Sequence, residues 1–151
     1  MKSNALKLLQ LTLWIICAFH LIVGISLNVP IGLKEWVGSG LYGAQVDWNH
    51  PQFVYILKPL GAFMIALGIM AGIAARNPLR NRAIIYGFAI LFIIRGLQRI
   101  VFLEEIQAAF GIGGSRHLST MVFMFLSAAL LLALLYFADK EPEPERRAVR
   151  T

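Results

Sequence analysis

Cysteine is almost absent from this sequence. The single example, Cys17, lies inside an apolar run. A disulfide framework, a CxxC redox pair and a cysteine-rich zinc site each need at least two cysteines, so all three are excluded within one chain.

Charged residues are also scarce. They make up 15% of the 151 residues, against about 25% in an average soluble domain, whereas 58% are hydrophobic. The charges occur in clusters separated by long uncharged stretches. This is the composition of a single domain that is solvated by lipid.

Acidic residues are few, and the net charge is +6. The basic residues do not form one patch that would indicate nucleic acid. They lie at the ends of apolar segments, where the preference for positive cytoplasmic loops explains them. We therefore expect membrane lipid as a partner and no nucleic acid.

Four apolar segments have the length of a membrane span, about 20 residues. The first run, Leu8 to Leu27, is longer than a cleavable signal core and is followed by no small-residue cleavage site, so it is predicted to be retained. The predicted helices cover 6–27, 53–75, 83–103 and 118–138 in one domain, 1–138, and 139–151 forms a charged cytoplasmic tail. The third helix contains Arg95 and Arg99, and a soluble amphipathic segment there would leave three spans.

Basic residues outside the spans favour one side of the membrane. In the four-span arrangement, one side carries nine of them and the other carries only Lys34 and Arg116. The nine are Lys2, Lys7, Arg76, Arg80, Arg82, Lys140, Arg146, Arg147 and Arg150. The positive-inside rule makes their side cytoplasmic. The sequence thus predicts an all-α membrane protein, an antiparallel bundle of four transmembrane helices with both ends inside.

The first outer loop, about 28–52, is rich in glycine, proline and aromatic residues. Such a segment lies at the membrane interface, either as an ordinary aromatic belt or as a lid over the bundle. In the second predicted helix, Gly61, Gly68 and Gly72 share one stripe. The stripe indicates close helix packing inside the bundle, with a homodimer contact or a seat for a flat ligand as alternatives.

Ionisable residues inside the spans are the least expected feature. By helical rise, His20, Lys58 and Arg95 each lie about 20 Å from the inner edge, on three different helices. Arg99 lies one turn further out, and His117 marks the outer end of the last span. A charge in the membrane is costly, which makes this cluster the candidate site.

The cluster has two interpretations. Glu104 and Glu105, of which Glu105 is nearer the face of Arg95, could make it a structural ion-pair network, with Lys58 and Arg99 reaching the headgroups. Alternatively, it is a pocket for an anionic or carbonyl-bearing molecule such as a lipid headgroup, a quinone or an organic acid, or a contact for a protein partner. The candidate ligand-binding residues are His20, Lys58, Arg95, Gln98, Arg99, Glu105 and His117.

Other chemistries fit less well. A haem between His20 and His117 is disfavoured because the two differ by roughly 10 Å in depth. A metal site has no recognisable ligand spacing, and the arginines repel cations. The sequence contains no recognisable nucleophile triad, phosphate loop or paired-carboxylate site, so catalytic residues stay unassigned.

The layout of the chain resembles the DoxX-like and BphX-like small bacterial membrane proteins. The resemblance covers most of the chain and rests on the four spans, the glycine- and aromatic-rich outer loop, Lys58-Pro-Leu-Gly, the short basic inner turn and the Arg95/Arg99 pair. Some members accompany aromatic-degradation operons or are subunits of quinone-linked oxidoreductases. The resemblance implies a bacterial inner-membrane location and a quinone or hydrophobic-substrate role, and it carries over no catalytic residue.

Three functions remain open from the sequence. The first is a binding protein or accessory subunit with an outer-leaflet pocket for an anionic or quinone-like, lipophilic ligand. The second is a membrane oxidoreductase or other enzyme that uses this pocket, with His20 or His117 as proton donor. The third is a structural subunit of a larger membrane complex.

Overall fold

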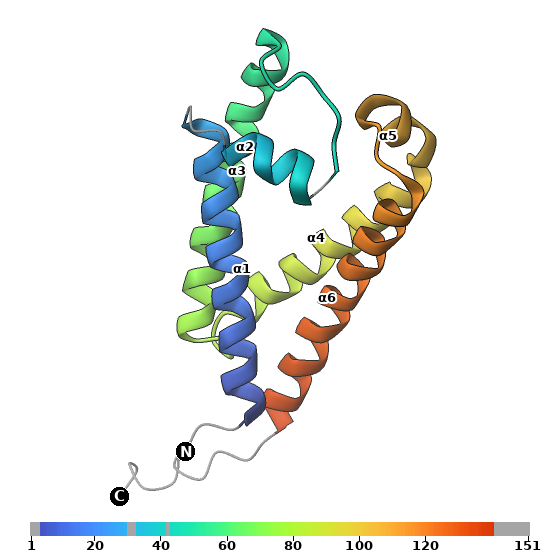
Figure 1. The fold of residues 1–151 in the computed structure, drawn as a ribbon. Helices are drawn as coiled ribbons and strands as arrows, with labels where there is room; N and C mark the ends of the chain where they lie inside the picture. The colour runs from blue at the N-terminus through green and yellow to red at the C-terminus, as the bar shows by residue number, and fades with distance from the viewer. Residues whose placement is uncertain (1–3, 30–32, 42, 141–151) are drawn as a thin grey trace, which may run out of the picture.

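A computed structural model describes residues 4–29, 33–41 and 43–140, and these are helical apart from short connections. Four helices are long and apolar enough to cross a membrane: α1 (Asn4–Asn28), α3 (Pro51–Arg76), α4 (Arg82–Val101) and α6 (Gly114–Lys140) (Figure 1). The prediction of an all-helical chain with four such segments is confirmed. Asp139 and Lys140, placed in the predicted tail, continue α6, and 141–151 lie outside the described residues.

Three shorter helices lie beyond the ends of the long ones. They are α2 (Leu33–Glu35), the π-helical turn η1 (Trp36–Leu41) and α5 (Leu103–Phe110). The third predicted span was expected to continue to 103, but the helical geometry breaks at Phe102, which has φ −108° and ψ 33°. The chain then starts α5, which ends at Gly111 in the left-handed conformation with φ 62° that favours glycine.

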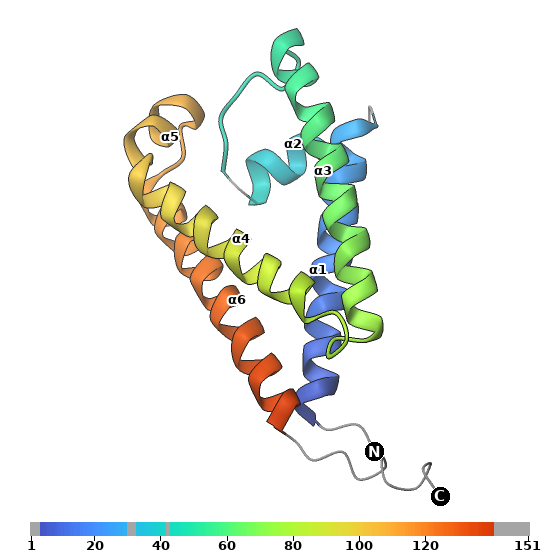
Figure 2. The same cartoon turned by 180° about the vertical axis from the view of Figure 1, so that it is seen from behind.

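The long helices form two pairs. Helix α1 packs along α3, α4 packs along α6, and α1 also contacts α6. Figures 1 and 2 show the pairs close together at one end, which holds the start of α1, the end of α6 and the α3–α4 connection. Towards the other end the pairs spread apart. We call these the convergent end and the spread end.

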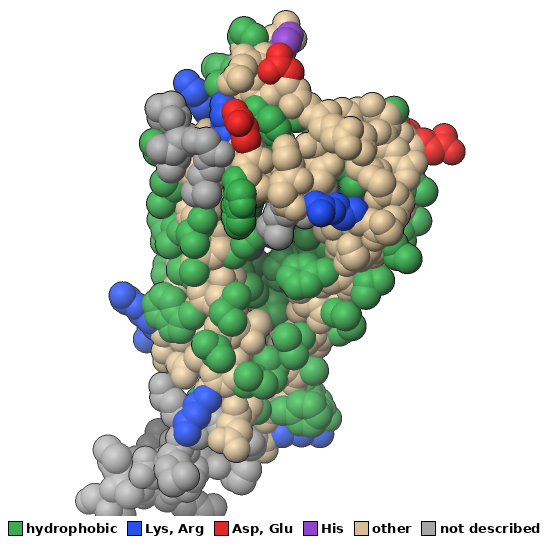
Figure 3. All heavy atoms as spheres, in the orientation of Figure 1, with side chains coloured by type: hydrophobic (Ala, Val, Ile, Leu, Met, Phe, Trp, Pro, Cys, Tyr) green, Lys and Arg blue, Asp and Glu red, His purple; other side chains and the backbone are tan. Residues whose placement is uncertain are grey.

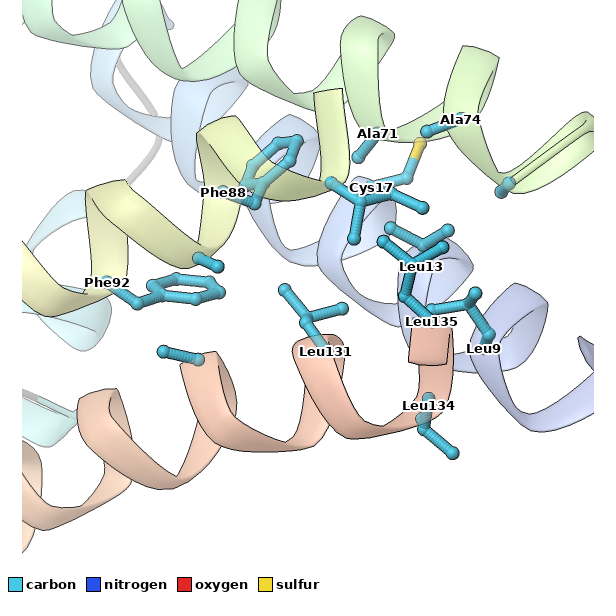
Figure 4. Close-up of a cluster of buried hydrophobic side chains, with 14 of the residues drawn as sticks. Leu9, Leu13, Cys17, Ala71, Ala74, Phe88, Phe92, Leu131, Leu134 and Leu135 are labelled. Atoms are coloured by element: carbon cyan, nitrogen blue, oxygen red, sulfur yellow. The ribbon is translucent and has the colours of Figure 1, made fainter. Parts of the chain in front are cut away.

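The apolar core lies where the pairs come together. Leu9, Leu13 and Cys17 recur every four residues on α1, so they form one stripe that faces the other helices. Phe88 of α4 and Leu131 of α6 meet this stripe (Figure 4). The core therefore ties both pairs together over only part of their length.

Glycines bring α1 and α3 into contact along the first pair. A Cβ atom added to Gly24 would lie 2.8 Å from the Gly61 carbonyl oxygen, and the converse distance is also 2.8 Å. A Cβ on Gly68 would lie 2.8 Å from the Leu21 side chain. The predicted role of the Gly61–Gly72 stripe in close helix packing is confirmed, because only hydrogen atoms fit at these positions.

Candidate functional site

His20 lies on the inward face of α1 and is 5% exposed. Its Nδ1 atom is 2.8 Å from the Ile16 carbonyl oxygen. A carbonyl oxygen only accepts, so Nδ1 carries the hydrogen of this bond. Nε2 makes no hydrogen bond to a described residue, yet no fully buried side-chain nitrogen or oxygen in the described ranges lacks a partner. Nε2 therefore keeps at least a small exposed area, although the residue as a whole is buried.

Two aromatic rings pack against the imidazole. The Phe19 and Phe88 rings lie edge-on to it, each with its centroid 5.6 Å away. Phe88 belongs to α4, so His20 stands where α4 crosses α1. The backbone bond and the two rings together fix the orientation of Nε2.

Arg95 lies two turns beyond Phe88 on α4. Its guanidinium is close enough to His20 to interact with it electrostatically. The side chain is exposed, and it forms no hydrogen bond or ion pair with any other described residue. The helical rise places Arg95 about 20 Å from the start of α4.

Arg99 and His117 form a second arginine–histidine contact nearer the spread end. His117 Nε2 donates a hydrogen bond to the Arg99 carbonyl oxygen at 2.5 Å, and Arg99 Nη1 lies 3.5 Å from His117 Nδ1. The guanidinium only donates, so Nδ1 is the acceptor in this contact. This contact holds the start of α6 against the end of α4.

The other sequence-predicted residues lie outside these two contacts. Lys58 is exposed on α3, because Gly61 faces α1 and Lys58 is about 60° round the helix from it. Gln98 is also exposed, since the buried face of α4 runs through Ala89 and Gly96 instead. The predicted cluster thus divides into His20–Arg95 and Arg99–His117.

Glu104 and Glu105 do not neutralise Arg95 in this structure. Both are exposed on α5, which buries none of its residues, and neither forms an ion pair with Arg95. The ion pair that the described residues do form joins Arg82 and Asp139 at the convergent end. An internal ion-pair network around Arg95 is therefore not formed by the described residues.

Sequence reasoning did not foresee how the first outer loop is organised. The Trp48 indole donates to Ser39 Oγ at 3.0 Å and covers Gly38, where an added Cβ would lie 1.7 Å from the ring. The Lys34 ammonium donates to the Trp48 carbonyl oxygen at 3.1 Å. The glycines between 38 and 43 indicated a close contact within this loop. Their spacing in the sequence did not identify Trp48 as the partner.

The outer loop also joins the two helix pairs. Arg116 of α6 donates to the Gly40 carbonyl oxygen at 2.6 Å. The backbone N–H of Gln45 donates to the Phe110 carbonyl oxygen at 2.7 Å. Figure 3 shows hydrophobic side chains along the flanks of the long helices and a hollow between the pairs, next to this loop. The loop therefore bridges the spread end rather than extending away from it.

Comparisons with known proteins add no family. The sequence matches no protein-family model and no curated protein, and no solved structure matches it. Within the described ranges, no three histidine, cysteine, aspartate or glutamate side chains gather as metal ligands. His20 and Arg95 are therefore the residues of the candidate site.

Proposed function

We propose that the chain is a multi-pass protein of the bacterial inner membrane that binds a lipophilic molecule through an anionic or carbonyl-bearing head group. The binding residues are His20 and Arg95, at the point where the two helix pairs begin to spread. The DoxX-like and BphX-like resemblance of the sequence, with its implied quinone role, belongs to this proposal.

The proposed orientation is an antiparallel bundle with the convergent end in the cytoplasm. The convergent end carries Lys7 and Lys140 together with the arginines of the α3–α4 turn. The spread end carries two basic residues outside the predicted spans, Lys34 and Arg116. The positive-inside rule favours this orientation and places His20 and Arg95 in the outer half of the membrane.

One observation carries the proposal: within the apolar helices, an imidazole oriented by its backbone bond interacts electrostatically with an arginine that has no acidic partner among the described residues. An arginine at the centre of a membrane helix costs about 2.5–3.5 kcal/mol. A bound anion or carbonyl would offset this cost by accepting hydrogen bonds from the guanidinium. The hydrophobic flanks of the surrounding helices suit the lipophilic remainder of the molecule.

The two side chains have complementary chemistry towards a quinone-like head group. Arg95 donates hydrogen bonds to a carbonyl or anionic oxygen. With Nδ1–H engaged by Ile16, His20 Nε2 accepts a hydrogen bond from a hydroxyl group, and its protonated form would donate to a carbonyl. The site therefore suits both the carbonyl and the hydroxyl form of such a ligand.

The fixed Nε2 also supports a second candidate, an oxidoreductase subunit. An imidazole whose Nδ1–H is held by a carbonyl has an unprotonated Nε2, which can take up the proton released by a bound hydroxyl group. Binding alone does not require proton transfer. Turnover of a quinone or quinol by the purified protein, lost in His20→Asn with binding retained, would favour this candidate over simple binding.

Copurification tests the binding function. The protein is purified in mild detergent and analysed by native mass spectrometry and absorption spectroscopy, alongside Arg95→Ala and the neighbouring exposed control Ile94→Ala. We expect a bound quinone or lipid in the wild type and the control, and its loss in Arg95→Ala with the melting temperature retained. No bound molecule in the wild type, or equal retention in all three proteins, would overturn the proposal.

A further inference from the structure

A separate open pocket lies at the spread end, between the outer loop and the α5–α6 connection. Its volume is about 620 Å³, within the usual range for small-molecule sites. Its lining comes from two chain segments that are distant in sequence, and it includes none of the residues of the site proposed above. The lining residues are Ser39, Gly43, Ala44, Gln45, Val46, Trp48, Gly111, Gly113, Ser115 and Arg116.

Arg116 is the charged member of this lining, and its position is fixed. Its Nη1 atom donates to the Gly40 carbonyl oxygen at 2.6 Å and lies 3.5 Å from the Ser39 carbonyl oxygen. Its stem lies against Gly43, where an added Cβ would be 2.6 Å from Arg116 Cδ. Gly43 has φ 72°, a backbone conformation that favours glycine. The absence of a side chain also allows the stem of Arg116 to approach this closely.

The remaining donors of Arg116 are available. Nε and Nη2 form no hydrogen bond with a described residue, and together they make the planar edge that binds a carboxylate through two parallel hydrogen bonds. The lining adds Ser39, Gln45 and Ser115 as polar groups and contains no acidic side chain. Asp47 adjoins the lining but is not part of it.

We infer that this pocket binds a small organic acid, whose carboxylate pairs with the Nε–Nη2 edge of Arg116 beside the Trp48 ring. The contacts of Nη1 with the outer loop position the guanidinium before the ligand arrives, which reduces the entropy lost on binding. The inference does not depend on the ligand proposed for His20 and Arg95, because the two sets of residues share no member.

The test is a fluorescence titration of the detergent-purified protein. Trp14→Phe and Trp36→Phe, at exposed positions, leave Trp48 as the reporter. The probes are succinate and inorganic phosphate at constant ionic strength, so that a carboxylate site is distinguished from a general anion site. We expect saturable binding of succinate, and tighter binding of phosphate than of succinate would overturn the carboxylate assignment.

Two variants test the role of Arg116. Arg116→Gln should weaken succinate binding about ten- to hundredfold, the range of a lost charged hydrogen-bond pair. Because this variant also removes the Gly40 contact, Ser115→Asp is the second: it leaves Arg116 bonded and introduces a negative charge into the pocket. Ala108→Asp on α5, outside the lining, is the matched charge control.

The variants decide the inference whether or not Arg116→Gln folds. Loss of succinate binding in Ser115→Asp with normal affinity in Ala108→Asp would support it. No saturable response in the parent protein, unchanged affinity in Ser115→Asp, or an equal loss in both aspartate variants would overturn it. Copurification at the His20–Arg95 site is measured in the same preparations, so failure of one site is separated from failure of the other.

Discussion

His117 makes two hydrogen bonds to one residue, Arg99: its Nε2–H bonds the backbone carbonyl and its Nδ1 accepts from the guanidinium. The Arg99 carbonyl belongs to the last turn of α4, which ends at Val101. The last carbonyls of a helix need partners from elsewhere. His117 supplies one from the start of α6.

Replacement of His117 should therefore loosen the α4–α6 pair at the spread end. His117→Ala removes this part-buried hydrogen bond, which costs about 0.5–1.5 kcal/mol, and we expect a lower melting temperature in detergent. His50→Ala, at an exposed position on the outer loop, is the control and should melt like the wild type. Equal melting temperatures for His117→Ala and the wild type would show that the double contact does not stabilise the fold.

Gly61 should tolerate no side chain, in contrast to Gly87. A Cβ on Gly61 would lie 2.2 Å from Asn28 Nδ2 and 2.8 Å from the Gly24 carbonyl oxygen, whereas nothing lies within 4 Å of one on Gly87. Gly61→Ala is expected to cost about 1–3 kcal/mol by overpacking. Gly87→Ala should be neutral or stabilising by up to about 1 kcal/mol, from helix propensity.

Unfolding measured by steric trapping in bicelles compares these two variants directly. Both substitutions add one methyl group to a membrane helix. The difference between their unfolding free energies therefore reports the α1–α3 contact and not the change in composition. If the two variants had the same unfolding free energy, the α1–α3 contact at Gly24 and Gly61 would be wrong.

Gly38 should be needed for the packing of Trp48. An added Cβ would lie 1.7 Å from the indole, so Gly38→Ala must displace the ring and its hydrogen bond to Ser39. We expect a red-shifted Trp48 emission and stronger quenching by iodide in a Trp14→Phe, Trp36→Phe background. Gly113→Ala, with no atom within 4 Å, is the control, and identical spectra for the two variants would contradict the described loop.

The four candidate spans were predictable because each is a long, mainly apolar run, which hydropathy detects without knowledge of tertiary contacts. The small stripe at Gly61 and Gly68 was predictable for a similar reason: small residues at helical spacing need a close neighbour wherever it comes from. Features that depend on one segment alone were thus available from the sequence.

Which polar side chains meet across the helices was not available. Equal depth suggested that Lys58, His20 and Arg95 meet, but depth does not determine which way a side chain points. Lys58 differs from Gly61 by about 60° of rotation, enough to leave it exposed while Gly61 is buried. The break at Phe102, which separates α4 from α5, also has no glycine or proline to indicate it.

The proposed orientation predicts which loops are accessible from outside the cell. Cys17→Ala removes the single cysteine, and Ser115→Cys or Asn77→Cys then places one thiol at an exposed position at the spread or convergent end. In intact spheroplasts, a membrane-impermeant maleimide should label Ser115→Cys at once and Asn77→Cys only after permeabilisation. The reverse pattern would place the arginines of the α3–α4 turn outside, against the positive-inside rule, and would move His20 and Arg95 to the cytoplasmic half of the membrane. Labelling of both positions in intact spheroplasts would mean that α4, the one candidate span between the α3–α4 turn and Ser115, does not cross the membrane.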